Sequence, residues 1–540
     1  MLVSATVPIA PVPVEEDTAF IGHPRGLFVL FFAEMWERFS YYGMRALLIF
    51  YLTKHFLFGD AAAAGIVTTY GSLVYLTPVL GGLIADRYLG ARRAVIFGAI
   101  LLCFGHLGMA IEGAPAHATA QGVVRADWSL QVLYLSLALI ITGVGFLKAN
   151  ISTMVGQLYG PNDARRDGGF TLFYMGINLG AFIAALVCGY LGETYGWSYG
   201  FGLAGVGMLA GLFTFIRGQA ALGSAGEPPD LALLKARLSI GLGMGLSRQG
   251  IVYVGGLLAV VVAWQLIQQR AMVGTMLQVT AVGAVAGIVL FSFLRCAPVE
   301  RDRMLLLLVL TAISVVFWAL FEQAGTSLNL FTDRNVDREM FGTTVAASQF
   351  QSVNPAFIIL LAPLFSRLWP WLAARGYEPS TPAKFGLAVV QVGLGFLALV
   401  YGATRADAAH HVGVFWLVLA YFLHTTGELC LSPVGLSAVS RLSVPRAVGL
   451  MMGVWFLASA FAQNVAGIIA ALMSVQGEGG ATADAGQALA TYVSTFNQIA
   501  WGAIAIGALV LLVSPLLRQL MHAEALVHAP GLPRGSSGNI

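Results

Sequence analysis

Seven ionisable residues lie inside long apolar segments, away from the segment ends: Glu34, Glu37, Arg38, Arg45, Lys148, Glu322 and Glu428. A charge at the centre of a lipid bilayer costs about 2.5–3.5 kcal/mol on insertion scales, so seven unpaired charges would cost roughly 20 kcal/mol. A typical fold has a total stability of only about 5–15 kcal/mol. The seven charges must therefore pair with one another or face a wet cavity, which makes them candidates for function.

Three of these charges share one face of the first apolar segment. Glu34, Glu37 and Arg38 stand at positions i, i+3 and i+4, and Glu34 and Arg38 have the spacing of a helical ion pair. Carboxyl groups in a low-dielectric setting can carry protons, so these acids are candidate proton carriers together with those of the second half. The alternative is a purely structural ion-pair cluster, although buried pairs seldom repay their desolvation.

The intramembrane charges divide unequally between the two halves of the chain. The first half holds the cations Arg38, Arg45 and Lys148 with two acids, whereas the second half holds only Glu322 and Glu428. A cavity between the halves would have a cationic wall opposite an anionic wall. That field favours a zwitterion with separated ends, and a short peptide fits it better than a simple sugar or a monovalent anion.

Lys148 and Glu428 occupy matching positions in the two halves. Lys148 is followed by Ser152 after four residues, and Glu428 is followed by Ser432 after four residues. If both segments face the cavity, a Lys148–Glu428 ion pair could form and break as the halves move. The spacing alone leaves open whether this ion pair forms.

The composition requires a chain that lies mostly in lipid. Of 540 residues, 58% are hydrophobic and only 10% are charged, and the mean hydropathy is +0.80. Soluble domains carry about 25% charged residues. These values exclude a soluble enzyme, a disordered chain, a nucleic-acid binder and a protein with a single membrane anchor. The four Cys are widely spaced and form no C-x-x-C motif, so we expect no disulfide framework and no metal site.

Fourteen apolar runs are long enough to cross a bilayer as helices, because about 20 residues of helix span its core. Their ranges are 26–53, 62–85, 94–112, 128–156, 168–192, 197–217, 250–269, 272–295, 304–330, 342–370, 384–403, 412–440, 447–475 and 487–520. An even number places both termini on one side. On this topology 20 of the 29 Lys and Arg residues lie on the side of the termini and six on the other, which predicts cytosolic termini.

The order of the runs predicts an all-α integral membrane protein with the major facilitator fold. We expect a cytosolic tail at 1–25, a six-helix bundle at 26–217, a linker with an inserted transmembrane helix pair at 218–299, a second six-helix bundle at 300–521 and a cytosolic tail at 522–540. A G-x-x-x-D-R-x-x-G-x-R-R motif after the second run resembles the cytoplasmic loop signature of that superfamily. Its residues are Gly82, Asp86, Arg87, Gly90, Arg92 and Arg93.

Seven ordered motifs resemble the proton-dependent oligopeptide transporter (POT) family of the major facilitator superfamily. They are E-M-W-E-R-F-S-Y-Y-G-M-R from Glu34, G-F-L-K-A-N-I-S around Lys148, F-Y-M-G-I-N-L-G-A-F from Phe173, F-W-A-L-F-E-Q from Phe317, F-Q-S-V-N-P from Phe350, G-E-L-C-L-S-P-V-G from Gly427 and M-M-G-V-W-F-L from Met451. The matches cover about 420 residues. Ala149 stands where the family often has Pro, and Phe321 stands where some members have Gln or Glu.

The resemblance implies roles for the matching residues. It assigns the peptide carboxylate to Arg45 and Lys148, and the peptide backbone and amine to Asn178, Asn354 and Glu428. The implied pocket positions are Tyr41, Tyr42, Tyr75, Trp318, Ser432 and Trp455. The implied proton-coupling residues are Glu34, Glu37, Arg38, Lys148, Glu322 and Glu428. The alternatives are packing for the aromatic residues and interhelical hydrogen bonds for the two Asn side chains.

We therefore expect a proton-coupled symporter that imports di- and tripeptides across the cytoplasmic (inner) membrane by alternating access. Its expected partners are a small peptide, protons and membrane lipid, with no nucleic acid, and we expect a monomer that needs no cofactor. The main alternative is a related transporter for nitrate, an amino acid or a drug. A polytopic membrane enzyme is disfavoured because His106 and His424 have no His or Cys partner at metal-ligand spacing. A passive channel is disfavoured by the paired charges.

Overall fold

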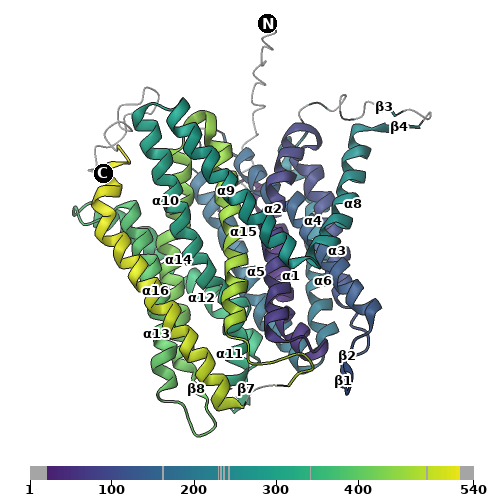
Figure 1. The fold of residues 1–540 in the computed structure, drawn as a ribbon. Helices are drawn as coiled ribbons and strands as arrows, with labels where there is room; N and C mark the ends of the chain where they lie inside the picture. The colour runs from purple at the N-terminus through teal and green to yellow at the C-terminus, as the bar shows by residue number, and fades with distance from the viewer. Residues whose placement is uncertain are drawn as a thin grey trace.

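The computed structural model describes residues 21–160, 163, 165–228, 230, 234, 237–240, 244–340, 342–481 and 484–522. The two predicted tails, 1–25 and 522–540, therefore lie almost wholly outside the described residues. The described chain ends lie together at one end of the helical bundle, called here the terminal end (Figure 1). The other end, which carries β1, β2, β7 and β8, is called the opposite end.

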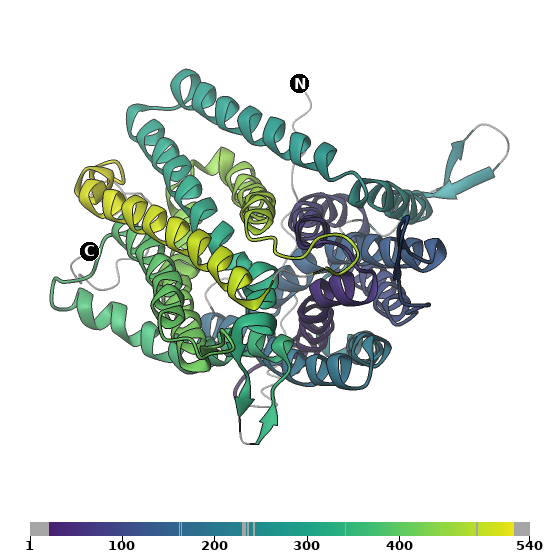
Figure 2. The ribbon, with the colours of Figure 1, turned by 60° about the horizontal axis from the view of Figure 1, so that its bottom comes forward.

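Two groups of six long segments form the molecule, as predicted (Figures 1 and 2). The first group is α1 (Arg25–Phe50), α2 (Asp60–Ile84), α3 (Ala91–Met109), α4 (Asp127–Gln157), α5 (Arg166–Thr194) and α6 (Trp197–Arg217). The second group is α10 with α11 (Pro298–Phe321, Ser327–Asn335), α12 (Val353–Ala373), α13 (Thr381–Ala403), α14 (Val414–Leu442), α15 (Val448–Leu472) and α16 (Ala485–Gln519). We call them the N-half and the C-half.

Short helical turns and two-residue to four-residue strands complete the structure. The turns are η1 (Tyr51–His55), η2 (Ala85–Leu89), η3 (Gln219–Leu222), η4 (Glu322–Gly325), η5 (Ala347–Ser352) and η6 (Pro445–Ala447). The strands are β1 (His117–Thr119), β2 (Gly122–Val124), β3 (Arg237–Ile240), β4 (Met244–Ser247), β5 (Val336–Asp337), β6 (Glu339–Met340), β7 (Thr343–Thr344) and β8 (Val412–Gly413). Only β5 and β8 pair in parallel; β1–β2, β3–β4 and β6–β7 are antiparallel.

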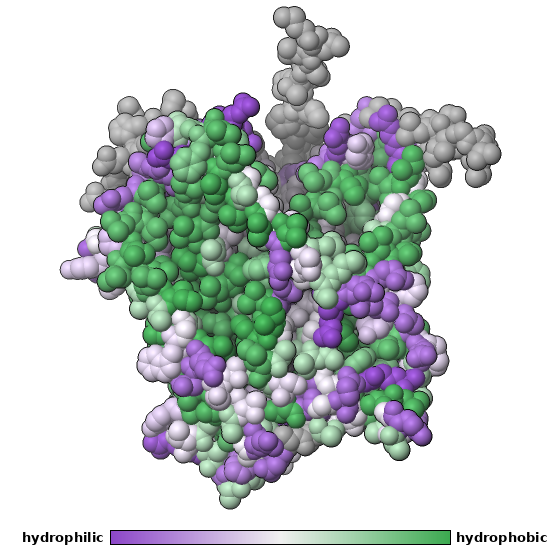
Figure 3. All heavy atoms as spheres, in the orientation of Figure 1, coloured by the Kyte–Doolittle hydropathy of each residue, from purple (hydrophilic) through white to green (hydrophobic). Residues whose placement is uncertain are grey.

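Thirteen helices in the described residues are long and apolar enough to cross a membrane. Helices suit a bilayer because they satisfy their backbone hydrogen bonds internally. α1 is the fourteenth long segment; it has 26 residues, carries four of the seven intramembrane charges and packs against α5 and α6 inside the N-half. On the face drawn in Figure 3, hydrophobic residues cover most of the left side between the two ends, whereas hydrophilic residues lie at both ends, along the line between the halves and on part of the right side.

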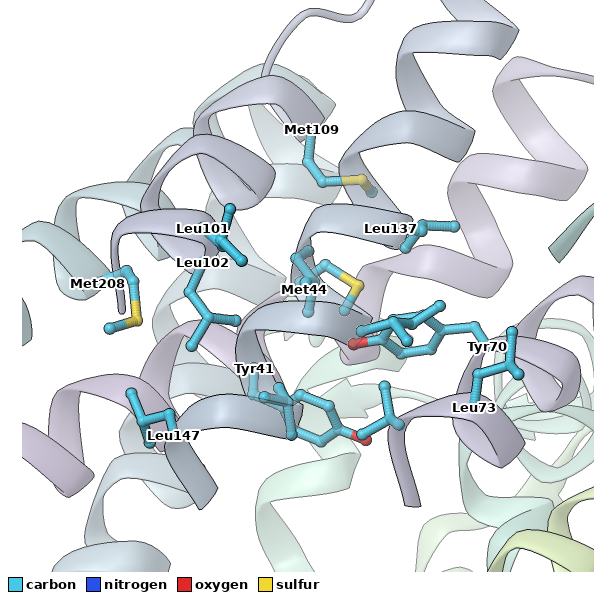
Figure 4. Packing of buried hydrophobic residues seen from close by; sticks show 14 of the residues in the cluster. Tyr41, Met44, Tyr70, Leu73, Leu101, Leu102, Met109, Leu137, Leu147 and Met208 are labelled. Atoms are coloured by element: carbon cyan, nitrogen blue, oxygen red, sulfur yellow. The ribbon is translucent and has the colours of Figure 1, made fainter. Parts of the chain in front are cut away.

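Two large clusters of buried apolar residues are centred on the N-half and on the C-half. In the N-half, Tyr41 and Met44 of α1 pack among apolar side chains of α2, α3 and α4 (Figure 4). α3 and α4 approach closely because Gly98 and Gly143 face each other, and a Cβ atom on either would press on the facing backbone. Small residues allow this kind of contact between membrane helices. The N-half cluster also includes Leu330, Ala347, Leu457 and Ala460 of the C-half, so the two halves also share apolar contacts.

The inserted pair, α8 (Arg248–Ile267) and α9 (Arg270–Arg295), bridges the two halves. α8 packs on α4, and Tyr253 of α8 stacks on Phe97 of the neighbouring α3 at 4.7 Å between ring centroids. α9 packs on α15 and α10 of the C-half. Figure 2 shows the pair crossing outside the bundles. The sequence offered no role for these helices beyond contact with lipid, and the structure makes them a link between the halves.

The ninth predicted segment, 304–330, is broken rather than continuous. α10 ends at Phe321, a short turn η4 holds Glu322, and α11 begins at Ser327 after a non-helical Thr326. Glu322 was expected inside a helix and away from its ends; that expectation is wrong, because Glu322 sits where the helix stops. The break brings its carboxylate towards α1 of the other half.

Candidate functional site

The first part of the site is the charge cluster of α1. Glu34, Glu37 and Arg38 are all buried, with 3%, 1% and 4% of their surface exposed. The Arg38 Nε donates to Glu37 and lies 3.2 Å from Glu34 Oε1, so the predicted i, i+4 pair forms. One oxygen of each acid and Nη2 of Arg38 have no hydrogen-bond partner among the described residues. Buried polar atoms are normally paired, so this cluster has spare capacity for a proton or water.

The second part is an ion pair between the two halves. Arg45 of α1 donates through Nη2 to Oε2 of Glu322 in η4. Arg45 also lies against the backbone at Gly325, where a side chain would collide with the guanidinium group. A small cavity adjoins the pair and is lined by Tyr41, Tyr70 and Gln463 among others. A residue assigned to the substrate carboxylate is therefore already bound to an internal carboxylate.

The third part is Lys148, whose side chain is half-buried on α4. Its Nζ lies 4.7 Å from the ring centroid of Tyr75, a cation–π contact. The charges of Glu34, Glu37, Arg38 and Glu322 all act on Lys148. None of the ion pairs found among the described residues joins Lys148 to an acid, so its ammonium group remains available to a ligand.

The fourth part is Glu428 on α14, in the facing half. Its Oε2 accepts a hydrogen bond of 3.0 Å from Nδ2 of Asn354 on α12. The same Asn354 nitrogen lies 3.0 Å from Thr425 Oγ1, which fixes the amide beside the carboxylate. The Lys148–Glu428 ion pair that the spacing suggested is not formed in this structure, because Lys148 lies on Tyr75 and Glu428 is held by Asn354.

Tyr42 connects these parts. It is half-buried, its ring meets that of Tyr41 edge to face at 5.3 Å, and the charges of Arg38, Arg45, Glu322 and Glu428 all act on its hydroxyl group. The structure therefore brings together the predicted residues of the α1 cluster, Tyr41, Tyr42, Arg45, Tyr75, Lys148, Glu322, Asn354 and Glu428.

Four predicted residues lie away from these contacts. Asn178 is buried and donates to the carbonyl oxygen of Tyr174 in its own helix, at 3.0 Å. Trp455 is buried in the C-half core against Phe385, which is the packing alternative. Trp318 is half-buried and its ring contacts Phe317 and Phe321. Ser432 is half-buried on α14, one turn after Glu428.

The sequence reasoning missed a network that closes the opposite end. Arg334 of α11 binds both oxygens of Asp60 at the start of α2, at 2.7 and 2.9 Å. It also donates to Gln476 and Tyr492, at 2.7 and 3.1 Å. Burial lowers the pKa of Arg334, but its hydrogen bond and charge interaction with Asp60 outweigh burial and raise the pKa above its usual value. We call Asp60, Arg334, Gln476 and Tyr492 the outer latch.

Further bonds between the halves surround the outer latch. The backbone N–H groups of Val475 and Gln476 each donate to Asp60 at 2.9 Å. Lys54 lies 2.8 Å from Asp333 at the surface, and Arg125 pairs with Glu478. Within the described residues, the polar bonds found between the two halves lie from the middle of the bundle to the opposite end. The halves are thus joined at one end, while their terminal ends share no such bond in the part of the chain described.

In the described part of the chain, no group of three or more His, Cys, Asp or Glu residues could hold a metal ion. His106 is buried, and neither of its ring nitrogens has a hydrogen-bond partner in the part of the chain that the structure describes. His424 lies 3.2 Å from the carbonyl oxygen of Val392.

Comparison with known proteins gives consistent matches along the chain. The family model described as "PTR2: POT family" matches residues 92–484. The chain belongs to the POT family. The chain is 39% identical to the peptide transporter YePEPT of Yersinia enterocolitica, over 83% of this chain and 88% of the relative. It is 35% identical to a di-/tripeptide transporter of Lactococcus lactis, over 83% and 89% of the two chains.

A solved structure agrees with the fold of this POT family member. A mutant of the peptide transporter POT in complex with alafosfalin superimposes with a TM-score of 0.77 at 35% sequence identity, covering 93% of this chain and 97% of the other. The predicted fold class, an all-α membrane protein with the major facilitator architecture, is confirmed. So is its membership of a family of multi-pass membrane transporters.

Proposed function

We propose that this protein is a proton-coupled symporter that imports di- and tripeptides. The observation that carries the proposal is the pair of facing walls: Arg45 and Lys148 on the N-half, and Glu428 on the C-half. A peptide carries a carboxylate and an ammonium group at its two ends, and these charges are complementary to opposite charges on opposite walls. The names of the relatives, a peptide transporter and a di-/tripeptide transporter, support the same substrate class.

Proton coupling follows from competition for Arg45. In the structure Glu322 forms an ion pair with the guanidinium group of Arg45, to which the peptide carboxylate would bind. A proton on Glu322 removes its negative charge, weakens the pair and frees Arg45 for the substrate. Proton and peptide then favour each other's binding, which is the condition for symport, because coupling between two sites is reciprocal. The α1 cluster, whose charges act on Lys148, is a second candidate site for protonation.

The same pair links proton binding to movement. Arg45–Glu322 is one of the bonds that join the halves, together with the outer latch. Loss of the pair therefore favours opening of the opposite end. In the cycle we propose, peptide and proton enter from that end, the outer latch closes again, and both leave at the terminal end, after which Glu322 returns to Arg45.

The orientation rests on the charge bias of the connecting loops, with 20 Lys and Arg on the side of the termini and six on the other. We propose that the terminal end is cytosolic, that the protein lies in the inner membrane, and that it works as a monomer without a cofactor. A potential of 100 mV supplies about 2.3 kcal/mol per proton, which supports roughly 50-fold peptide accumulation before any pH gradient is added.

Uptake of labelled dialanine into proteoliposomes tests this function. We expect concentrative uptake that requires an inward proton gradient and is competed by unlabelled dipeptide but not by nitrate, free alanine or a drug. Uptake that does not depend on the proton gradient would contradict the proposed proton coupling. Competition by nitrate or an amino acid alone would overturn the peptide assignment in favour of another small solute.

A further inference from the structure

A second polar cavity lies at the terminal end of the C-half, away from the peptide site. It has a volume of about 260 Å³ and lies between the end of α12, the start of α13 and the end of α14, with Met521 after α16 on its rim. Arg303 donates to the carbonyl oxygens of Met521 and His522, both at 2.9 Å, and so fixes that rim. All of its walls belong to one half, so the cavity keeps its shape when the halves move.

The cavity contains a buried ammonium group. Lys384 is only 6% exposed, and its Nζ lies 2.6 Å from Glu378 Oε1 and 4.3 Å from the ring centroid of Trp369. Glu378 accepts a hydrogen bond from one of the three N–H groups of the Lys384 ammonium group, which leaves two for a ligand. Arg441 is exposed and lines the same cavity. The cations outnumber the acid at this place, so the cavity suits an anion.

An apolar groove of about 380 Å³ adjoins this cavity on α12. It is lined by Leu364, Phe365, Leu368 and Trp371, with Arg367 at its edge. The two spaces are neighbours, because Phe365 of the groove contacts Trp369 of the cavity, edge to face at 5.6 Å between ring centroids. Leu364 and Trp371 are exposed on a membrane-crossing helix, so this groove faces hydrocarbon.

We propose that the two spaces together bind one anionic phospholipid, with the phosphate group at Lys384 and Arg441 and an acyl chain along the α12 groove. Charge complementarity selects an anionic headgroup, and the adjacent apolar groove selects a lipid over a free phosphate ion. Basic pockets between helices at the cytoplasmic end of membrane proteins favour anionic headgroups on the same grounds. The site does not depend on the transport assignment, because no residue of the peptide site lines it.

The experiment titrates the detergent-solubilised full chain with phosphatidylglycerol and counts bound lipid by native mass spectrometry. We expect one saturable site, and about fivefold weaker binding in Arg441→Gln, the factor of one basic residue at an anionic surface. Arg217→Gln is the matched control, because Arg217 is an exposed cation at the same end of the N-half and lies on Phe213. Its binding should equal that of the unaltered chain.

Glu378→Gln provides the sharper variant. It removes the carboxylate that competes for Lys384, so phosphatidylglycerol should bind more tightly, whereas a purely structural Lys384–Glu378 pair predicts no gain. Two other ligands complete the test. Equal binding of phosphatidylcholine with the same acyl chains would overturn the headgroup assignment. Inorganic phosphate that displaces phosphatidylglycerol at millimolar concentration would show a free-phosphate site and overturn the lipid assignment, as would equal binding by Arg441→Gln.

Discussion

The outer latch and the central site both join the two halves through an Arg–carboxylate pair, but their surroundings differ. Asp60 receives two bonds from Arg334 and two from backbone N–H groups, and Arg334 has two further partners. At the centre, Arg45 donates to Glu322, and several buried atoms of the nearby α1 cluster have no hydrogen-bond partner among the described residues. A network whose polar atoms have hydrogen-bond partners stabilises one conformation. A network with unpaired polar atoms can bind and release a proton or a ligand.

This difference separates two tasks within one protein. The outer latch sets how firmly the opposite end is closed, and the central pair sets what opens it. Changes in the outer latch should therefore alter the balance between conformations, and changes in the centre should alter coupling and substrate affinity.

The largest effect is expected from Arg334→Ala. The substitution leaves Asp60 buried without its cation, and the loss of one partner of a buried ion pair costs about 3–5 kcal/mol. The opposite end should therefore open, a shift of more than about 100-fold in the conformational equilibrium. Spin labels placed at Ala118 in β1 of the N-half and at Gly342 in the turn between β6 and β7 of the C-half would move apart in distance measurements. Unchanged label distances in a folded variant would refute the assignment of the latch.

A smaller but still large effect is expected from Glu322→Gln. The variant cannot exchange a proton at this position, so the roughly 50-fold accumulation that one proton supports at 100 mV should be lost. Exchange of peptide across the membrane without a gradient should continue, because the cationic wall remains. Asp407→Asn, at an exposed loop acid, is the control. Normal concentrative uptake by Glu322→Gln would contradict the account.

Glu428→Gln should weaken dipeptide binding by about tenfold or more, because hydrogen bonds to charged groups contribute about 1.5–3 kcal/mol. An N-acetylated dipeptide has no ammonium group, so its weak binding should be the same in the variant and the unaltered protein. Isothermal calorimetry with both ligands measures the difference. If the substitution weakens the binding of both ligands equally, Glu428 does not bind the peptide ammonium group.

The smallest effect is expected from Lys54→Gln, which removes the surface ion pair with Asp333. The Lys54 side chain is 41% exposed, and exposed pairs contribute about 1 kcal/mol or less. The distance distribution between the labels at Ala118 and Gly342 should change little. A shift as large as that of Arg334→Ala would mean that burial does not distinguish the two pairs.

The sequence predicted the helices well because lipid imposes a simple rule on length and hydropathy. It also placed Glu34 and Arg38 correctly as a pair, since their spacing is local. It could not predict that Asp60 meets Arg334, because the two residues are 274 positions apart and no local spacing relates them. The break after Phe321 was missed since the apolar run continues through it, and the Arg45–Glu322 pair depends on that break.

The most direct test of the central claim is dialanine affinity measured against pH. If Glu322 and the peptide carboxylate compete for Arg45, protonation of Glu322 at lower pH should strengthen binding, by up to about tenfold per pH unit for one linked proton. Glu322→Gln should bind with an affinity that no longer depends on pH over the same range. Affinity that is independent of pH in the unaltered protein, or an unchanged pH dependence in Glu322→Gln, would contradict the account.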